Sequence, residues 1–211
     1  TLNRGLISGS ISFRGAYALA LISFLIFYLV IINFNINALY LSPIVIILFL
    51  IYPLTKRFTF LCHYFLGLVY LIAPPAVEIA LTGRFSTETL FLGISGFFWV
   101  SGFDLIYAIL DIDFDKENNI HSIPSKFGIK ITKLLASMSH LLTLIFMLSI
   151  GLIININPIY WFGCTIIIIL FIREHFILKN ITKENINTAF FDMNGQISIM
   201  FMATFLLSII I

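Results

Sequence analysis

The stretch Asp104-Leu-Ile-Tyr-Ala-Ile-Leu-Asp-Ile-Asp-Phe-Asp-Lys116 closes an apolar run over 89–110 that is about as long as a membrane-spanning helix. It places four carboxylates in a chain of which only 10% of the residues are charged. Such a concentration of negative charge beside a bilayer needs a positive partner. Hard divalent cations, which take oxygen ligands, are the best candidates. The alternative is a solvated acidic loop that merely ends a helix.

The spacing of the acids predicts how they are arranged. Asp104, Asp111 and Asp115 are offset by seven and four positions, so at about 3.6 residues per turn they share one helix face while Asp113 points elsewhere. The acids are also expected at the C-terminal end of a helix, where the backbone dipole is unfavourable for anions. The cluster is therefore a candidate cation site.

The composition of the chain identifies its class. Its 211 residues are 60% hydrophobic and have a mean hydropathy of +1.08, so the polar residues are too few to cover a water-exposed surface. We expect an all-α, polytopic transmembrane bundle. Apolar runs predict its helices at 14–33, 38–53, 61–82, 89–110, 131–154, 158–178 and 195–211. The second run is short, at about 16 residues, and the last is cut by the end of the chain.

The basic residues predict the orientation of the bundle. If the N-terminus is cytoplasmic, eleven of the twelve Lys and Arg residues fall on the cytoplasmic side and only Arg84 falls opposite. This distribution predicts an odd number of helices in the inner (plasma) membrane and places the function in the cytoplasmic loops. The eleven residues are Arg4, Arg14, Lys56, Arg57, Lys116, Lys126, Lys130, Lys133, Arg173, Lys179 and Lys183.

Two more cytoplasmic segments carry candidate chemistry. The segment 52–59 includes Lys56 and Arg57, whose ammonium and guanidinium groups suit a diphosphate, although they could be simple membrane anchors. The segment 121–128 contains Pro124 early in a helix, so the free N–H groups of that helix start could face an anion. His140 and Asp192, in or near spans, are expected to have packing or capping roles.

An EF-hand calcium loop is excluded by two positions. Asp111, Asp113 and Asp115 would occupy its first three ligand positions, but Lys116 stands where the loop needs glycine. Ser122 stands where it needs the closing glutamate.

The two cysteines, which fall in separate spans, are expected to be buried free thiols.

Together these segments resemble the UbiA superfamily of membrane prenyltransferases, in particular the 4-hydroxybenzoate polyprenyltransferases and their relatives in menaquinone synthesis. The stretch 107–128 is similar to the family's second aspartate motif, with its Asp-x-x-x-Asp on Asp111 and Asp115. The segment 52–59 is similar to the family's loop between the fourth and fifth spans. The stretch 1–12 is similar to the sequence that follows the first aspartate motif.

The resemblance implies a fold of nine transmembrane helices, of which about seven are present here. It implies one membrane-embedded domain over 1–211, truncated at its N-terminus, without the first helices and the first aspartate motif. Such a fragment is expected to be inactive alone. The chain departs from the ubiquinone-type pattern at Cys62 and His63, where those members commonly have Pro-Gln.

The activity implied by the resemblance is transfer of a polyprenyl group from an allylic polyprenyl diphosphate to an aromatic acceptor, 4-hydroxybenzoate or a naphthoate-type quinone precursor. Asp111 and Asp115 would hold Mg²⁺ and, with Lys56 and Arg57, form the catalytic set. The substrate-binding residues would be Lys56, Arg57, Asp104, Tyr107 and Lys126. The two substrates and the lipid bilayer are the expected partners, and nucleic acid is not. The alternative function is a cation-coupled transporter that uses the acidic cluster.

Overall fold

The computed structural model describes residues 9–211, and within them long helices dominate. The helices are α1 (Phe13–Ile31), α2 (Ile36–Thr55), α3 (Cys62–Thr82), α4 (Thr87–Tyr107), η1 (Ala108–Asp111), α5 (Ile112–Glu117), α6 (Ile123–Ile153), α7 (Pro158–Ile177), α8 (Lys183–Asn187), η2 (Thr188–Met193) and α9 (Asn194–Ile210). Across the described residues, seven spans are long and apolar enough to cross a membrane. The predicted all-α transmembrane bundle is therefore confirmed.

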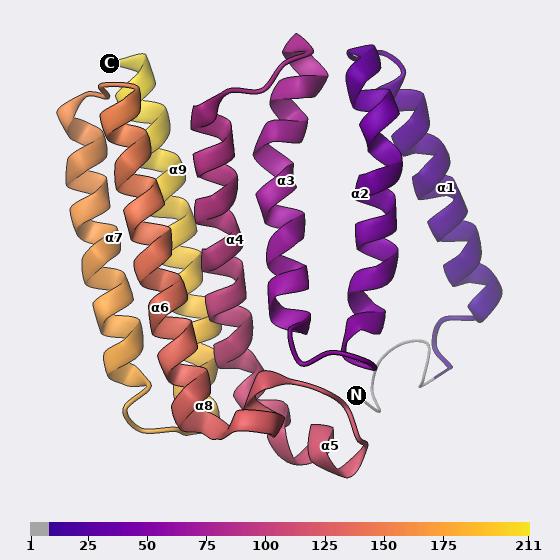
Figure 1. Cartoon of the computed structure of the whole chain (residues 1–211), viewed down its shortest axis with the longest axis vertical. Helices are drawn as coiled ribbons and strands as arrows, with labels where there is room; N and C mark the ends of the chain where they lie inside the picture. Colours follow the sequence, from indigo (N-terminus) through magenta and orange to yellow (C-terminus); the bar gives the residue numbers. More distant parts are fainter. Residues whose placement is uncertain (1–8) are drawn as a thin grey trace.

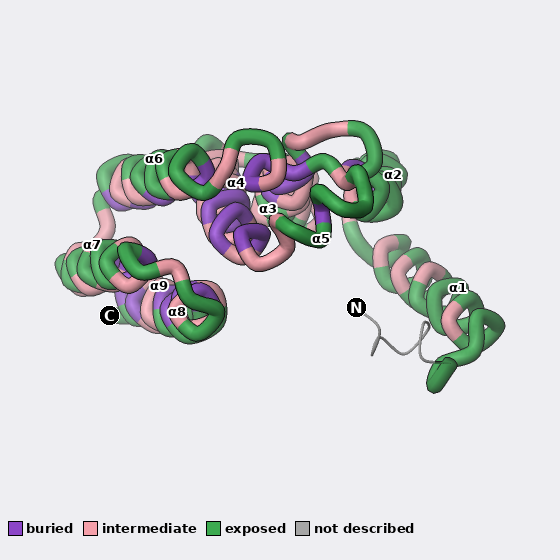
Figure 2. Tube along the Cα trace, turned by 90° about the horizontal axis from the view of Figure 1, so that it is seen from below, coloured by how far each residue is buried: buried purple, intermediate pink, exposed green. Residues whose placement is uncertain are grey.

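The long helices run side by side and alternate in direction (Figure 1). The α2–α3 loop, α5, the start of α6 and α8 gather at the lower end, and the C-terminus lies at the upper end. Seen from below, α6, α4, α3 and α2 form a row (Figure 2). The α7 and α9 helices, which pack on each other, lie beside one end of this row, and α1, which has no buried residue, lies beside the other.

The basic residues are distributed as the orientation prediction requires. Apart from Arg84, in the α3–α4 connection at the upper end, every Lys and Arg between residues 9 and 211 belongs to the lower loops or to the adjoining helix turns (Figure 1). Arg4 and most of the stretch 1–12 lie outside the described residues. The basic residues at the lower end indicate that the lower loops all face the same side of the membrane. That this side is the cytoplasm stays a prediction.

Two helices are longer than predicted. The second span is not short, because α2 runs over 20 residues and includes Pro43 and Pro53. The fifth does not begin at 131 but at Ile123, where Ser122 and Ser125 form a reciprocal capping box. The predicted helix start in the 121–128 segment is therefore confirmed.

The first turns of α6 are set off from the rest of the helix by a kink. The backbone at Gly128 has φ 78° and ψ 172°, which is not helical and is accessible mainly to glycine. The short segment before Gly128 therefore turns away from the axis of the spanning part (Figure 1). This kink places the N-terminus of α6 against the lower loops.

The acidic stretch does not form one continuous helix, and this corrects the prediction. The α4 helix ends at Tyr107, a 3₁₀ turn covers Ala108–Asp111, and α5 starts at Ile112. The 3.6-residue register therefore does not carry from α4 into α5, and the predicted common face of the acids lacks its basis. The expected position at a helix C-terminus is also wrong for Asp113 and Asp115, which lie in the first turn of α5.

Two apolar cores hold the bundle together. The lower core joins α4, η1, α6 and the α7–α9 connection, and it includes Leu105, Ile106, Ile109, Ile123, Ala136, Leu178, Ile186 and Ala189. The upper core joins α6, α7 and α9 and includes Met147, Tyr160, Cys164, Ile167, Phe171 and Ile197. Both cysteines are buried free thiols, as predicted. The lower core supports the loops that carry the candidate site.

Candidate functional site

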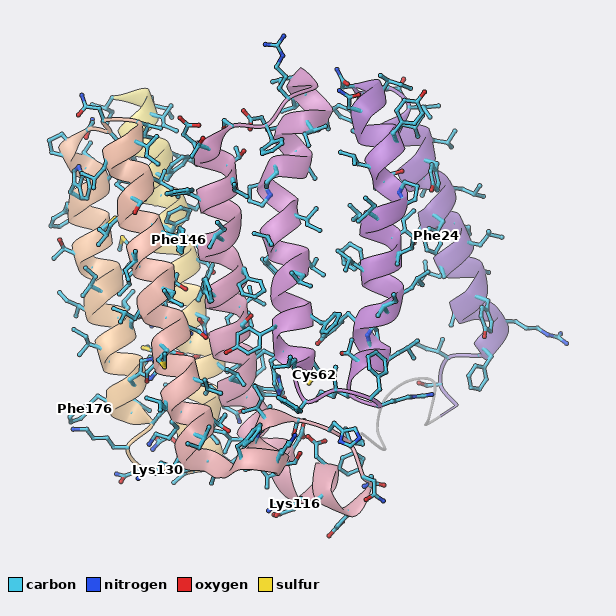
Figure 3. The ribbon with its side chains drawn as sticks, viewed as in Figure 1. Phe24, Cys62, Lys116, Lys130, Phe146 and Phe176 are labelled. Carbon is cyan, nitrogen blue, oxygen red and sulfur yellow. The ribbon has the colours of Figure 1, made fainter. Side chains whose placement is uncertain are left out.

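Two lower loops that are far apart in sequence are joined at their backbones. The N–H of His121, just before α6, donates a hydrogen bond to the carbonyl oxygen of Lys56, just after α2, at 2.8 Å. The thiol of Cys62 lies 3.7 Å from the carbonyl oxygen of His121, and Figure 3 places Cys62 beside this junction. The structure therefore brings the basic loop and the segment after the acids together, as the family resemblance implies.

The Lys126 ammonium group strengthens the same junction. Its Nζ lies 3.9 Å from the centre of the Phe60 ring, which belongs to the α2–α3 loop. A cation over an aromatic face is attracted by the negative charge of the ring face. Lys126, a predicted substrate-binding residue, is exposed and is held at the edge of the junction by this contact.

The charges of Lys56 and Arg57 are open to a ligand. Lys56 is half-buried and Arg57 is exposed, directly after the last residue of α2. Within the part of the chain that the structure describes, neither side chain forms a salt bridge. The two predicted diphosphate ligands thus lie at the lower end of the bundle and have no salt-bridge partner between residues 9 and 211.

Asp115 is the least solvated of the predicted acids. Its side chain is buried, with 2% of the residue exposed, and its Oδ2 has no hydrogen-bond partner within the described part of the chain. Asp111 is half-buried and Asp113 is exposed. A buried carboxylate oxygen without a partner is costly, and a bound cation is one way to compensate it. Asp111 and Asp115 are therefore less exposed than Asp113, and their role as metal ligands stays a prediction.

Asp104 has a specific partner that the sequence analysis missed. Its Oδ2 lies 2.7 Å from Nδ1 of His63, in the first turn of α3, and His63 is completely buried. The structure places Asp104 in this pair, on α4, and its role in binding substrate stays a prediction. The sequence signal for this pair is that Asp104 lies near the end of α4 and His63 at the start of α3, the preceding span.

Tyr107 lies in an aromatic group built from α4 and η2. Its ring centre is 4.3 Å from that of Phe190 and 6.1 Å from that of Phe191. The η2 segment is a π-helical turn, and the side chain of Asn194 donates to the carbonyl oxygens of Ala189 and Phe190, at 3.0 Å each. Such wide turns occur often at functional sites. The predicted substrate-binding tyrosine thus faces aromatic side chains.

The four acids do not by themselves form a compact metal cluster. In the region 9–211, the only group of three or more His, Cys, Asp or Glu ligand atoms lying within 4.8 Å of one another is elsewhere, on α6 and α7. Asp115 is the buried member of the acidic stretch, whose role as a cation site stays a prediction.

The pair of His63 and Asp104 allows a prediction for stability. Because either single change weakens a hydrogen bond to a carboxylate that involves the completely buried His63, His63→Gln and Asp104→Asn are each expected to cost about 1–3 kcal/mol in the free energy of unfolding. The double variant should be less destabilised than the sum, with a coupling of at least about 0.5 kcal/mol. The free energy of unfolding is measured by thermal unfolding in detergent for the wild type, the two single variants and the double variant. Strictly additive effects would show that the two side chains do not interact.

Comparison with known proteins adds the family context. The model of the UbiA prenyltransferase family matches residues 1–205. The chain is 27% identical over 190 residues to a 4-hydroxybenzoate octaprenyltransferase of Francisella tularensis subsp. mediasiatica (strain FSC147), covering 90% of this chain and 66% of that protein. It is also 27% identical over 190 residues to a 4-hydroxybenzoate octaprenyltransferase of Pseudoalteromonas translucida (strain TAC 125), covering 90% and 65%. The chain thus spans just under two thirds of the length of these relatives.

A solved structure has the same arrangement of helices. The apo structure of a UbiA homolog from Aeropyrum pernix K1 superposes with a TM-score of 0.87 and 26% sequence identity. The superposition covers 98% of this chain and 77% of that one.

Proposed function

This chain belongs to the UbiA prenyltransferase family, and from that premise we propose that it transfers a polyprenyl group from an allylic polyprenyl diphosphate to an aromatic acceptor. One observation carries the proposal. At the lower end of the bundle, Asp115 of α5 is buried, and within residues 9–211 its Oδ2 has no hydrogen-bond partner. Lys56 and Arg57 form no salt bridge in the same part of the chain, and the Lys56 carbonyl accepts the hydrogen bond from His121, which follows α5. A cation site beside open positive charges is what a diphosphate requires.

The residues present fit a magnesium ion. Mg²⁺ takes carboxylate oxygens and the oxygens of a substrate phosphate, and it keeps several waters, so one or two protein carboxylates are enough to anchor it. Asp115, with its unpartnered Oδ2, and the half-buried Asp111 are the residues that would hold the ion. When bound, Mg²⁺ supplies positive charge that stabilises the leaving diphosphate.

The proposed reaction is an electrophilic substitution on an aromatic ring. The bond between the allylic carbon and the diphosphate oxygen breaks, and the diphosphate leaves with the bonding electrons. A carbon of the acceptor ring, made electron-rich by its hydroxyl group, attacks the allylic cation and forms the new carbon–carbon bond. Loss of a ring proton restores aromaticity. Lys56 and Arg57 contribute fixed positive charge that is felt more strongly as the diphosphate departs.

The names of the relatives support a proposal for the acceptor. Their printed names describe 4-hydroxybenzoate octaprenyltransferases, and we propose 4-hydroxybenzoate or a naphthoate-type acid as the acceptor class in quinone biosynthesis. Such an acceptor carries a carboxylate. One cation of the Lys56–Arg57 pair therefore has two alternative ligands, the diphosphate of the donor and the carboxylate of the acceptor. The Tyr107–Phe190 aromatic group offers flat apolar surfaces for the acceptor ring.

The prenyl chain needs an apolar environment, and the bundle provides one. A cavity of about 670 Å³ lies between α1, α2 and α3 in the upper half of the bundle, and Ser42 is the single polar residue of its lining, which includes Phe27, Ala38, Val45, Leu71 and Pro75. It is far from the acids, so it does not suit the diphosphate. We propose that it receives the distal isoprene units of a long donor, whose hydrocarbon chain prefers such a lining.

The location of the acids also distinguishes the proposal from cation transport. Carrier sites lie near the middle of the bilayer, between repeated halves of the protein. Asp111 and Asp115 lie instead in the η1 and α5 segments at one end of the bundle, beside the basic loop (Figure 1). This position favours an enzyme that receives a charged headgroup at the membrane surface.

We predict that both halves of the proposed site face the cytoplasm. Thr59→Cys and Asn118→Cys are therefore expected to react with a membrane-impermeant maleimide from the cytoplasmic side only, in oriented vesicles that carry the full-length protein. Cys62 and Cys164 are buried and should give little background. Arg84→Cys, in the α3–α4 connection, is the matched control and should react from the opposite side. Labelling of Thr59→Cys and Asn118→Cys from opposite faces would contradict a composite site.

A further inference from the structure

A second polar cluster lies between α6 and α7, away from the loops of the proposed active site. It consists of His140 on α6 and Glu174 and His175 on α7. His140 and Glu174 are buried, with 1% and 0% of each residue exposed, and His175 is half-buried. Such polar groups inside a transmembrane interface are costly unless they bind one another or a ligand. The three therefore need an explanation that helix packing alone does not give.

The ligand atoms of the three residues have the spacing of a metal site. Nδ1 of His140 lies 3.0 Å from Nε2 of His175 and 3.5 Å from Oε2 of Glu174, and one ligand atom from each residue lies within 4.8 Å of the others. In a tetrahedral zinc site with bonds of about 2.0–2.2 Å, the ligand atoms are about 3.3–3.5 Å apart. Small adjustments of the side chains would therefore place an ion between the three.

Neighbouring residues fix the directions of the two imidazoles. The hydroxyl of Ser137 lies 3.2 Å from Nδ1 of His175, where it can accept that N–H and leave the Nε2 lone pair toward His140. The His140 ring lies against Phe171, with centres 4.6 Å apart. Its other edge meets Gly102 on α4, where any Cβ would collide with Nε2 and Cδ2. The His140 ring is thus held with Nδ1 directed toward α7.

The cluster is not satisfied by its own hydrogen bonds. Both carboxylate oxygens of Glu174 and Nε2 of His140 are buried and have no hydrogen-bond partner among the residues that the structure describes. An uncompensated carboxylate in a membrane interior is strongly unfavourable. A divalent cation bound beside Glu174 would offset the charge of this carboxylate. Among the described residues the Lys133 ammonium group forms no salt bridge with Glu174, and it donates to the carbonyl oxygen of Leu178 at 2.6 Å.

A ligand can approach the cluster from one side. A cavity of about 470 Å³ includes His140 and His175 in its lining, together with Ser137, Phe171 and Lys179. Lys179 follows α7 at the lower end of the bundle, so the cavity reaches toward the surface that carries the loops. This opening also leaves room for a water as a fourth ligand.

We propose that His140, Glu174 and His175 form a binding site for one divalent transition-metal ion of the zinc type. Two imidazoles with one carboxylate are a ligand set that zinc accepts and that magnesium does not prefer. The ion would join α6 to α7, and it would be distinct from the Mg²⁺ that Asp111 and Asp115 are proposed to hold. This site does not depend on the proposed prenyl transfer.

The test uses the full-length protein in detergent, freed of its affinity tag and of metal by chelation. Co²⁺ is titrated while its visible absorption is followed, and Zn²⁺ is then added. We expect one Co²⁺ per chain with the intense bands of a four-coordinate site, displaced by Zn²⁺. Zn²⁺ should also raise the melting temperature. Absence of binding, or only the weak bands of a six-coordinate oxygen site, would overturn the proposal.

Variants assign the signal to the cluster. Glu174→Gln and His175→Gln are expected to remove the four-coordinate spectrum and the Zn²⁺-dependent rise in melting temperature. Ser137→Ala should weaken binding by about 10- to 100-fold, as expected when the residue that orients a ligand is lost. Because the side chain of His175 is only half-buried, His175→Gln is expected to fold even if Glu174→Gln does not, and it then decides the test. His121→Gln, an exposed histidine outside the cluster, is the matched control. A spectrum that survives in both Glu174→Gln and His175→Gln would refute the assignment.

Discussion

Asp115→Asn in the full-length protein is expected to reduce prenyl transfer by about 100- to 1,000-fold, because an amide cannot supply the anionic oxygen that holds a cation against the diphosphate. The change keeps the size of a side chain that is only 2% exposed, so the bundle should still fold. Asp115→Ala and Asp111→Ala are expected to remove turnover as well, since each deletes a hard oxygen ligand. Mg²⁺ or Mn²⁺ should be required throughout.

The chain offers a matched control for this experiment. Asp113→Asn changes a carboxylate in the same turn of α5, but the side chain is exposed. It should keep activity within a few-fold of wild type. The measurement is the rate of transfer from a labelled polyprenyl diphosphate in membranes that hold equal amounts of each protein. Full activity of Asp115→Asn, or equal losses at Asp113 and Asp115, would remove Asp115 from the cation site.

Arg57→Lys is expected to lose about 10- to 100-fold in kcat/KM although the charge is kept, because a lysine cannot reproduce a two-pronged contact with a phosphate or carboxylate. Arg57 is exposed and has no salt bridge within the described part of the chain, so the loss would not reflect a change in folding. We expect Arg57 to contact the diphosphate, whose several charges can engage donors beyond the metal.

The kinetic pattern separates the two ligands of Arg57. A raised KM for the donor with an unchanged KM for the acceptor would support contact with the diphosphate. The reverse pattern would assign Arg57 to the acceptor carboxylate. Lys116→Arg, on an exposed residue of α5, is a control for basic substitution at the same surface and should be silent. Wild-type kinetics for both substrates in Arg57→Lys would rule out a direct contact.

The transmembrane architecture could be predicted because hydropathy depends on composition along the chain. Seven apolar runs gave seven spans, and the start of α6 was signalled by Ser122 and Pro124. The position of that start was nevertheless placed late, since Lys126 and Lys130 interrupt the apolar run. The non-helical backbone at Gly128 could not be inferred, because this residue precedes the predicted span over 131–154 and an isolated glycine does not by itself indicate a bend.

The arrangement of the acids was predicted only in part. Spacing alone assumed one regular helix, whereas the 3₁₀ turn at Ala108–Asp111 changes the register between Asp104 and Asp115. The spacing predicts only that Asp113 points away from Asp111 and Asp115 and says nothing of their burial, and the pairing of Asp104 with His63 depends on how α3 and α4 pack. Contacts between spans of distant sequence are set by tertiary packing, which local periodicity does not encode.

The cluster on α6 and α7 also depends on contacts between spans that local sequence patterns do not predict. His140 was expected to pack or cap, and its partners Glu174 and His175 are more than 30 residues away in sequence, without the short spacing of a metal motif. Their convergence needs both the antiparallel pairing of the two helices and the close approach of α4 at Gly102.

The most direct test of the proposed function is a transfer assay with the purified full-length protein in liposomes. Mg²⁺, a polyprenyl diphosphate and either 4-hydroxybenzoate or a hydroxynaphthoate are supplied, and the products are identified by mass spectrometry. The proposal predicts an acceptor that carries the prenyl group on a ring carbon, one diphosphate released per product, and loss of this product in Asp115→Asn. Release of diphosphate without any prenylated ring, or no consumption of the donor with either acceptor, would contradict it.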